Sequence, residues 1–409
     1  MKKFDVFELK NGVRGVLVDL PHLNSVTVEV FVKIGAKYET KDEFGISHVL
    51  EHMAFKGTKK RNAIEIHREI DSKGAIHDAG TGFECTSYYI STVEKNILWS
   101  LEFLSDILIN STFPKKELKK ELGVVVEEIK MYKDNPVMGL SFDLIEFLYG
   151  ESKSGCWSIS GSIEDVLRVD RDKLLAYRKK CLNAKDVVVV VAGKIGNKND
   201  IKKCIKRYFS DLNSLDVDDG KLELILSKKK ELIKKKKVDQ IHFCLGIPTI
   251  SNRDKRRYVA KLVEVMLCGN TSSRVFEQVR QKNGLAYYVF PVSEMLKEGG
   301  FMGVQIGVNL AKFDKALFLT KREYLEFAKT VSEFELNRAK DCLLGKSEMS
   351  LDKTSFWSDF VGRKLLLENK LVSLENELKK YKKVSLKEVK EFAKEFFRKD
   401  AFRLVVAKS

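Results

Sequence analysis

The feature that most restricts how this chain can fold is a weak internal repeat. The segment 48–53, His-Val-Leu-Glu-His-Met, aligns with 261–266, Lys-Leu-Val-Glu-Val-Met, at an offset of 213 residues. Glutamate falls on glutamate and methionine on methionine, and both segments have the apolar spacing of a helix. Such a repeat predicts two halves of one architecture. The second copy lacks both histidines, so only the first half can carry a histidine-based site.

Strand-like and helix-like patterns alternate along the chain. Runs rich in β-branched residues predict strands at 15–19, 26–34 and 187–192, with a further strand ending at 90–92. Helical spacing predicts helices from about residue 47 and at 63–73, 97–110 and 115–132. This alternation predicts a layered α+β fold.

The composition changes near the middle of the chain. Residues 215–220 are polar and turn-prone, and lysine runs follow at 228–230 and 234–237. We therefore predict an N-terminal half at 1–214, a linker at 215–237 and a C-terminal half at 238–409. The lysines are interpreted as a solvated connector or an edge strand. A nucleic-acid groove is the weaker alternative, because no aromatic residues are interleaved with them.

Charge and cysteine content narrow the class of protein. The net charge is +16, from 74 basic and 58 acidic residues, and 44% apolar residues are enough for a core. The seven cysteines include no C-x-x-C pair, which argues against a disulfide framework or zinc ribbon. The first residues lack the apolar run of a signal peptide, and no run of about 18 apolar residues occurs. These features predict a cytoplasmic protein without a membrane span.

The string His48-Val49-Leu50-Glu51-His52 carries the clearest chemical signal. On a helix, His48 and His52 lie one turn apart on one face, where two imidazoles can bind one metal ion. Glu51 projects to the same side and can take a proton from water activated by that metal. This order is the inverted zinc-peptidase signature. The alternative is a helix with two hydrogen-bonded histidines and a surface glutamate.

A catalytic zinc needs a third protein ligand, and the helix at 115–132 offers one. With Glu121 at 0°, Glu128 lies at about −20° and Glu127 at about −120°. Both Glu121 and Glu128 therefore project from an apolar arc, where an unpartnered carboxylate is costly. We predict Glu128 as the ligand and Glu121 as its outer support. The alternative is that both pair with arginine or cap a loop. Apolar residues within about 100° of Glu121 are Leu118, Leu122, Val124, Val125, Ile129 and Met131.

The segment 45–58, Gly-Ile-Ser-His-Val-Leu-Glu-His-Met-Ala-Phe-Lys-Gly-Thr, resembles the pitrilysin/insulinase superfamily (M16) of zinc metallopeptidases. The pattern is closest to the short-chain branch similar to mitochondrial processing peptidase. The resemblance implies two homologous halves, each a mainly antiparallel sheet packed with helices. It also implies a third zinc ligand about 76 residues past the second histidine, which is Glu128 here.

Residues 74–89 resemble the family strand that borders the active site. The resemblance implies that substrate adds there as an extra strand along Ala79, Gly80 and Thr81. Asp78 stands where the family usually has Asn, and Gly80 where a larger residue is common. We expect His77 to be a spectator, because a catalytic zinc keeps one position open.

Residues 272–276 and 279–287 resemble the family's C-terminal signature. The resemblance implies that Arg280 and Tyr287 contact the substrate carbonyls and the tetrahedral intermediate. A guanidinium and a phenol are suitable donors to a developing oxyanion. Ordinary packing of both side chains is the alternative.

Together these features predict a zinc-dependent metalloendopeptidase with one Zn2+ per chain, acting on unfolded peptides. In the family two such pairs of halves enclose a chamber, and a 409-residue chain supplies one pair. We therefore expect a homodimer in which Arg280 and Tyr287 serve the partner's zinc, with a heterodimer as second choice. We expect no nucleic-acid or membrane partner. The alternatives are a metal-free assembly subunit of the same fold and a basic nucleic-acid-binding protein.

Overall fold

The computed structural model describes residues 4–152, 157–215 and 223–409. Cys156 and most of the turn-prone part of the predicted linker, residues 216–220, lie outside these ranges. The chain forms two compact units. Unit 1 comprises Met1–Ile129, Ser154–Lys221 and Met349–Ser373, and unit 2 comprises Lys130–Lys153, Leu222–Glu348 and Leu374–Ser409.

Unit 1 is built on a six-stranded sheet in the order β1-β2-β6-β3-β5-β4. Only β2 and β6 pair in parallel, so the sheet is mainly antiparallel, as the resemblance implied. β6 is buried along its whole length, which is why its sequence is an uninterrupted apolar run. The strands are β1 (Asp5–Glu8), β2 (Arg14–Asp19), β3 (Ser25–Val32), β4 (Ile76–Thr81), β5 (Thr86–Val93) and β6 (Val187–Gly193).

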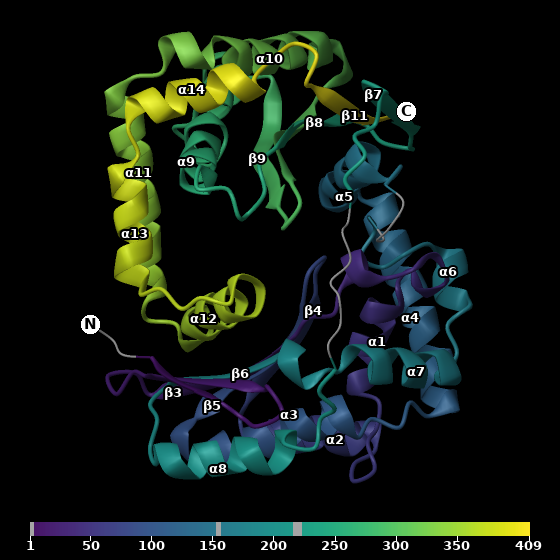
Figure 1. Cartoon of the computed structure of the whole chain (residues 1–409). Helices are drawn as coiled ribbons and strands as arrows, with labels where there is room; N and C mark the ends of the chain where they lie inside the picture. The colour runs from purple at the N-terminus through teal and green to yellow at the C-terminus, as the bar shows by residue number, and fades with distance from the viewer. Residues whose placement is uncertain (1–3, 153–156, 216–222) are drawn as a thin grey trace. The chain divides into compact units, whose positions relative to one another are not determined.

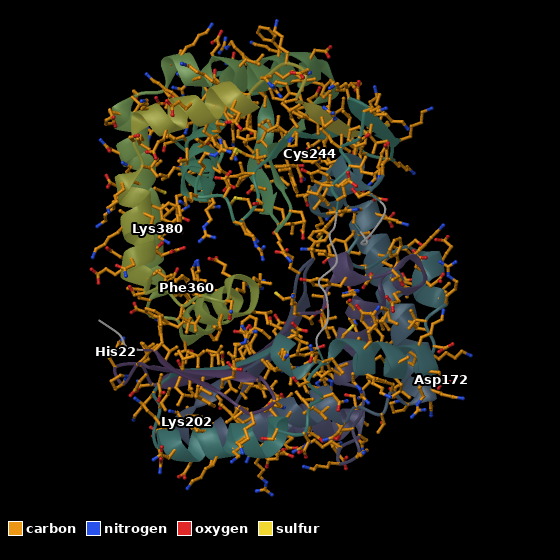
Figure 2. The ribbon with its side chains drawn as sticks, viewed as in Figure 1. His22, Asp172, Lys202, Cys244, Phe360 and Lys380 are labelled. Carbon is orange, nitrogen blue, oxygen red and sulfur yellow. The ribbon has the colours of Figure 1, made fainter. Side chains whose placement is uncertain are left out.

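Helices cover both faces of this sheet. α3 packs against β3 and β5 and against α8, whereas α12 lies on β3 and β6 (Figure 1). Lys202 on α8, labelled in Figure 2, forms an ion pair of 2.8 Å with Asp5 of β1. The helices predicted from spacing agree with the structure to within about two residues. The helices are α1 (Ile46–Ala54), α2 (Ala63–Ser72), α3 (Ile97–Ile109), α4 (Lys115–Asp134), α6 (Ile163–Leu167), α7 (Arg171–Cys181), α8 (Lys198–Phe209) and α12 (Thr354–Glu368).

α12 approaches the sheet very closely. A Cβ on Gly362 would lie 2.0 Å from the ring of Phe31, so only glycine fits there. Hydrogen bonds add to this contact: the hydroxyls of Thr354 and Thr27 are 2.8 Å apart, and Ser358 donates to Glu29 at 2.6 Å. Burial raises the pKa of Glu29 to about 7, against the opposing effect of the Ser358 hydrogen bond.

Unit 2 repeats the plan with five strands in the order β7-β11-β8-β10-β9. β7 pairs with β11 in parallel, and the other pairs are antiparallel. β7 lies at the sheet edge and contains Lys234 and Lys235, which confirms the edge-strand interpretation for these two lysines. The strands are β7 (Glu231–Lys235), β8 (Ile241–Thr249), β9 (Ala286–Met295), β10 (Gly300–Val308) and β11 (Arg403–Lys408).

Some helices of unit 2 pack on its sheet and others pack on neighbouring helices. α14 packs on α9, α10 and β8, and α5 contacts β8, β10 and β11. Among the described helices, none combines the length and apolar character needed to cross a bilayer. The helices are α5 (Pro136–Tyr149), α9 (Arg257–Leu267), α10 (Phe313–Thr330), α11 (Glu333–Ser350), α13 (Leu374–Lys383) and α14 (Leu386–Phe396).

The strand pairings support the internal repeat. β2, β3, β4, β5 and β6 pair among themselves as β7, β8, β9, β10 and β11 do, including the single parallel pair. Helix α1 follows β3 as α9 follows β8, at the two aligned segments. The two sheets are therefore two copies of one topology.

The compact units do not follow the sequence halves. α5 precedes residue 214, yet Tyr149 donates to the carbonyl of Gly300 at 2.6 Å in unit 2. α12 follows residue 238, yet it belongs to unit 1. The end of the predicted 215–237 linker is strand β7, so that part of the linker belongs to the second sheet.

Candidate metal centre

Helix α1 carries the His pair, and its start is fixed by a tight approach. Gly45, the N-cap residue, has φ of 80°, and a Cβ there would lie 2.5 Å from the carbonyl oxygen of Ser160. Glycine is therefore required at this position. Val49 and Met53 bury the opposite side of the helix in the core, and His48 is itself buried.

Three ligand atoms converge at this helix. Nε2 of His48 and Nε2 of His52 are 3.2 Å apart, and Oε2 of Glu128 lies 3.6 Å and 3.5 Å from them. Among the described residues, these three form a group able to hold a metal ion. A tetrahedral zinc with bonds of about 2.05 Å separates its ligand atoms by about 3.3 Å. The donor set and its spacing therefore fit zinc.

Helix α4 supplies the two carboxylates as the helical spacing predicted. Glu121 is buried, Glu128 is partly buried and Glu127 is exposed. Two members of the predicted apolar arc do not belong to the core: Val124 is 51% exposed and Met131 46%. The buried stripe is narrower than an arc of about 100° on either side of Glu121. Its described members on α4 are Leu118, Glu121, Val125 and Ile129.

Glu121 supports the site from outside. Its Oε1 lies 2.9 Å from Nδ1 of His52, and its Oε2 lies 2.7 Å from Nζ of Lys56. A carboxylate on the remote ring nitrogen fixes the tautomer of a metal-binding histidine and points Nε2 toward the ion. Nδ1 of His48, in contrast, is buried without a hydrogen-bond partner in the described structure.

Lys56 was not predicted from the sequence. Its position within the segment 45–58, which carries the family resemblance, was the one feature of the sequence that could have pointed to it. Arginine was the alternative partner of Glu121 considered from the sequence. The structure shows another basic residue, Lys56, paired with this carboxylate.

The three titrating groups of the site influence each other. Burial and the neighbouring His52 lower the pKa of His48. Burial would also lower the pKa of His52, but hydrogen bonds to Glu121 and Glu128 outweigh it and raise that pKa. Burial opposes ionisation of Glu121, yet its bonds to His52 and Lys56 lower its pKa overall. A metal that binds Nε2 of His52 therefore competes with protonation of this ring.

Glu51 lies beside the ligands and is held by a hydroxyl. Thr81 Oγ1 donates to Glu51 Oε2 at 2.6 Å. Burial raises the pKa of Glu51, and the Thr81 bond opposes this rise. Thr81 was predicted as a substrate contact, and the structure shows a bond to the expected proton acceptor. It ends β4, the edge strand of the sheet, directly after Ala79 and Gly80.

His77 is not a member of the metal group. Its ring lies 5.4 Å from that of Phe55 and 5.8 Å from that of His67, measured between centroids. This packing agrees with its predicted role as a spectator.

Unit 2 holds an ion pair at the equivalent position. Lys261, which aligns with His48, lies 2.6 Å from the buried carboxylate of Glu264, and Ser293 of β9 also bonds Glu264. An ammonium group thus satisfies this glutamate in the second copy. Arg280 and Tyr287 lie in unit 2, both exposed. Their predicted contacts with substrate stay a prediction.

Comparisons with known proteins agree with this geometry. The profile of Insulinase (Peptidase family M16) matches residues 15–149, and that of the Peptidase M16 inactive domain matches residues 168–343. The uncharacterized zinc protease YmxG of Bacillus subtilis is 32% identical over 396 residues, covering 96% of each chain. The chain belongs to peptidase family M16. An uncharacterized zinc protease of Rickettsia bellii is 28% identical and covers 99% of this chain and 98% of its own.

Solved structures share the family fold. A protease from Helicobacter pylori superposes with a TM-score of 0.90 at 22% identity, covering 100% of both chains. The M16 inactive domain from Pseudomonas fluorescens gives a TM-score of 0.90 at 18% identity, covering 99% of this chain and 98% of its own. At these identities the likeness concerns the fold.

Proposed function

We propose that the protein is a zinc-dependent metalloendopeptidase that hydrolyses peptide bonds in unfolded peptides. The observation that carries the proposal is the donor triangle of His48, His52 and Glu128 with Glu51 beside it. Two imidazoles and one carboxylate leave a fourth tetrahedral position open, as catalytic zinc sites require.

The residues of the site would have separate roles in the reaction. His48, His52 and Glu128 would hold one zinc ion. Zinc in this place supplies Lewis acidity, which lowers the pKa of water there to about 7 and polarises a carbonyl. Glu51 accepts a proton from the attacking water at its carboxylate and returns it to the leaving amine. Thr81 orients Glu51 through its hydrogen bond, and Glu121 with Lys56 orients His52.

The substrate class follows from the edge strand β4. A peptide that pairs with the free edge of β4 along Ala79–Thr81 would be recognised by backbone hydrogen bonds. Such pairing requires an extended chain, so unfolded peptides are favoured over folded proteins. Gly80 is exposed, and a Cβ there would meet no atom within 4 Å. The strand therefore offers room for substrate side chains at this point.

Arg280 and Tyr287 are proposed to donate hydrogen bonds to the oxyanion formed from the scissile carbonyl. We propose a homodimer in which this pair serves the zinc of the partner subunit, with one zinc per chain. The lysine at the His48-equivalent position of unit 2 supports the single zinc. A heterodimer with a related chain is the second choice.

The test combines metal analysis with peptide digestion. Purified protein should contain about one zinc per chain, and it should cleave members of a peptide library unless a chelator is present. Glu51→Gln should retain zinc and lose about 10²–10⁴-fold in turnover, because only the proton acceptor is removed. Protein without zinc, or full activity of Glu51→Gln, would overturn the proposal.

A further inference from the structure

A buried glutamate lies at the beginning of the metal-binding helix. Glu39 is 2% exposed and follows a short 3₁₀ turn at Ala36–Tyr38. Its Oε2 accepts a hydrogen bond from the backbone N–H of Gly45 at 2.7 Å, and its Oε1 accepts one from the N–H of Ser47 at 2.9 Å. Nothing in the hydrolytic proposal above uses this carboxylate.

The contact replaces the cap that α1 lacks. The N-cap residue Gly45 offers no side-chain acceptor, and the first turn contains no acidic residue. The N–H groups at a helix start need partners, and the positive end of the helix favours an anion. Glu39 meets both needs from six residues before the N-cap, and its own charge becomes buried. Burial raises the pKa of Glu39 to about 7, and the bonds from Ser47 and Gly45 oppose this rise.

A second bond extends the connection to α7. Ser47 Oγ lies 2.8 Å from the hydroxyl of Tyr177, which is 2% exposed. Ser47 immediately precedes His48. The start of α1 is therefore held on two sides within one residue of the first metal ligand, by Glu39 through the backbone and by Tyr177 through the side chain.

We propose that Glu39 is a positioning residue of the metal centre, which fixes the placement of α1 so that His48 and His52 meet Glu128. The inference rests on the proposed zinc site. α1 has only nine residues, and a helix rotates by about 100° and advances by about 1.5 Å per residue. A small shift of its start therefore moves both imidazoles, while productive sites tolerate only about 0.5 Å.

The test compares two buried glutamates of the same unit. Glu39→Gln replaces one acceptor oxygen by an NH2 group that faces an N–H donor. Glu29→Gln is the matched control, because Glu29 is also buried, with a pKa of about 7, yet bonds Ser358 of α12. Zinc affinity is measured by chelator competition at pH 8, with thermal unfolding of the metal-free proteins recorded alongside.

Glu39→Gln should weaken zinc binding about 10–100-fold, the range seen when outer partners of metal ligands are removed. It should also change the visible spectrum of the cobalt-substituted protein, which reports ligand geometry. Glu29→Gln should bind zinc within about twofold of wild type and keep the cobalt spectrum. Glu39→Asp, which keeps the carboxylate, should recover part of the affinity.

The outcomes separate the two proposals. Equal zinc affinity and an unchanged cobalt spectrum in Glu39→Gln would overturn the positioning role alone. A wild-type protein that binds no zinc would overturn the proposed function and this inference with it. If Glu39→Gln does not fold, Tyr177→Phe removes only the hydroxyl that holds Ser47. It should then weaken zinc binding measurably, and an unchanged affinity would count against the inference.

Discussion

Nζ of Lys56 lies 2.7 Å from Oε2 of Glu121, whose other oxygen lies 2.9 Å from Nδ1 of His52. A cation, a carboxylate and an imidazole thus form one line that ends at the metal position. All three are partly or largely buried, so their interactions are less screened than surface ion pairs. His52 and Lys56, which both contact Glu121, are only four positions apart in the sequence.

Replacing Lys56 by Met should weaken zinc binding about 10-fold. The substitution removes the positive charge that keeps Glu121 ionised and aimed at His52, and its apolar stem is retained. Lys56→Arg keeps the charge and should keep most of the affinity. Chelator competition measures both, and unchanged binding in Lys56→Met would exclude this role for the lysine.

The two adjacent glutamates of α4 should differ sharply. Glu128→Gln removes a ligand and should abolish stoichiometric zinc binding and peptidase activity, because the neutral amide is a poor zinc ligand. Glu127→Gln, one residue earlier on the exposed side, should keep both. Zinc content by mass spectrometry and peptide cleavage form the measurement. Loss of zinc in Glu127→Gln with retention in Glu128→Gln would show that the ligand was assigned to the wrong residue.

Thr81→Val should shift the pH dependence of activity. The Thr81 hydrogen bond stabilises the ionised form of Glu51 and lowers its pKa against the effect of burial. Without the hydroxyl the pKa of Glu51 rises further, so the acid limb of the kcat/KM profile should move to higher pH. Thr81→Ser keeps the donor and should keep the wild-type profile. A profile that is the same in all three proteins would contradict the contact.

Glu29 should make the wild type less stable as pH rises. Its folded pKa of about 7 lies above the ordinary 4.5, so the folded state retains a proton that the unfolded state loses. The free energy of unfolding should therefore fall between about pH 4.5 and 7, by about 3 kcal/mol from this group, and stay level above. Glu29→Gln should lose this part of the decline in urea unfolding curves, whereas the part from Glu39, whose pKa is also raised to about 7, should remain.

Ser358→Ala should change the pH dependence of stability in the opposite direction to Glu29→Gln. Removing the Ser358 hydroxyl takes away a bond that lowers the pKa of Glu29, so the decline should extend to higher pH. Parallel pH profiles for wild type, Glu29→Gln and Ser358→Ala would show that Glu29 is not the titrating group.

Helical spacing indicated which side chains of each helix lie on the same face as the candidate metal ligands. The offset of four positions from His48 to His52, and of seven from Glu121 to Glu128, lies within a single helix in each case, so the sequence alone contains it. Whether the two helices meet depends on tertiary packing, and here the resemblance supplied the link between His52 and Glu128. The exposure of Val124 and Met131 shows where this prediction fails. A helical wheel gives the direction of each side chain, but it does not give the width of the buried face.

Several contacts that support the site and the sheet had no periodic signal in the sequence. Glu39 lies in a polar stretch without regular spacing, and its partners are backbone groups, which every sequence offers. Lys56 has a long side chain whose partner depends on where α4 passes. The packing of α12 was also not predicted, because its contact with the sheet depends in part on Thr354, Ser358 and Gly362, which give no apolar signal.

The placement of α12 has a consequence for biosynthesis. The last strand of the first sheet ends at Gly193, but the helix that covers β3 and β6 begins at Thr354. At about 5–20 residues per second, a ribosome needs on the order of ten seconds to make the intervening chain. During that time α12 does not yet lie over Glu29 and Phe31, so unit 1 cannot complete its packing until the C-terminal part of the chain has been made.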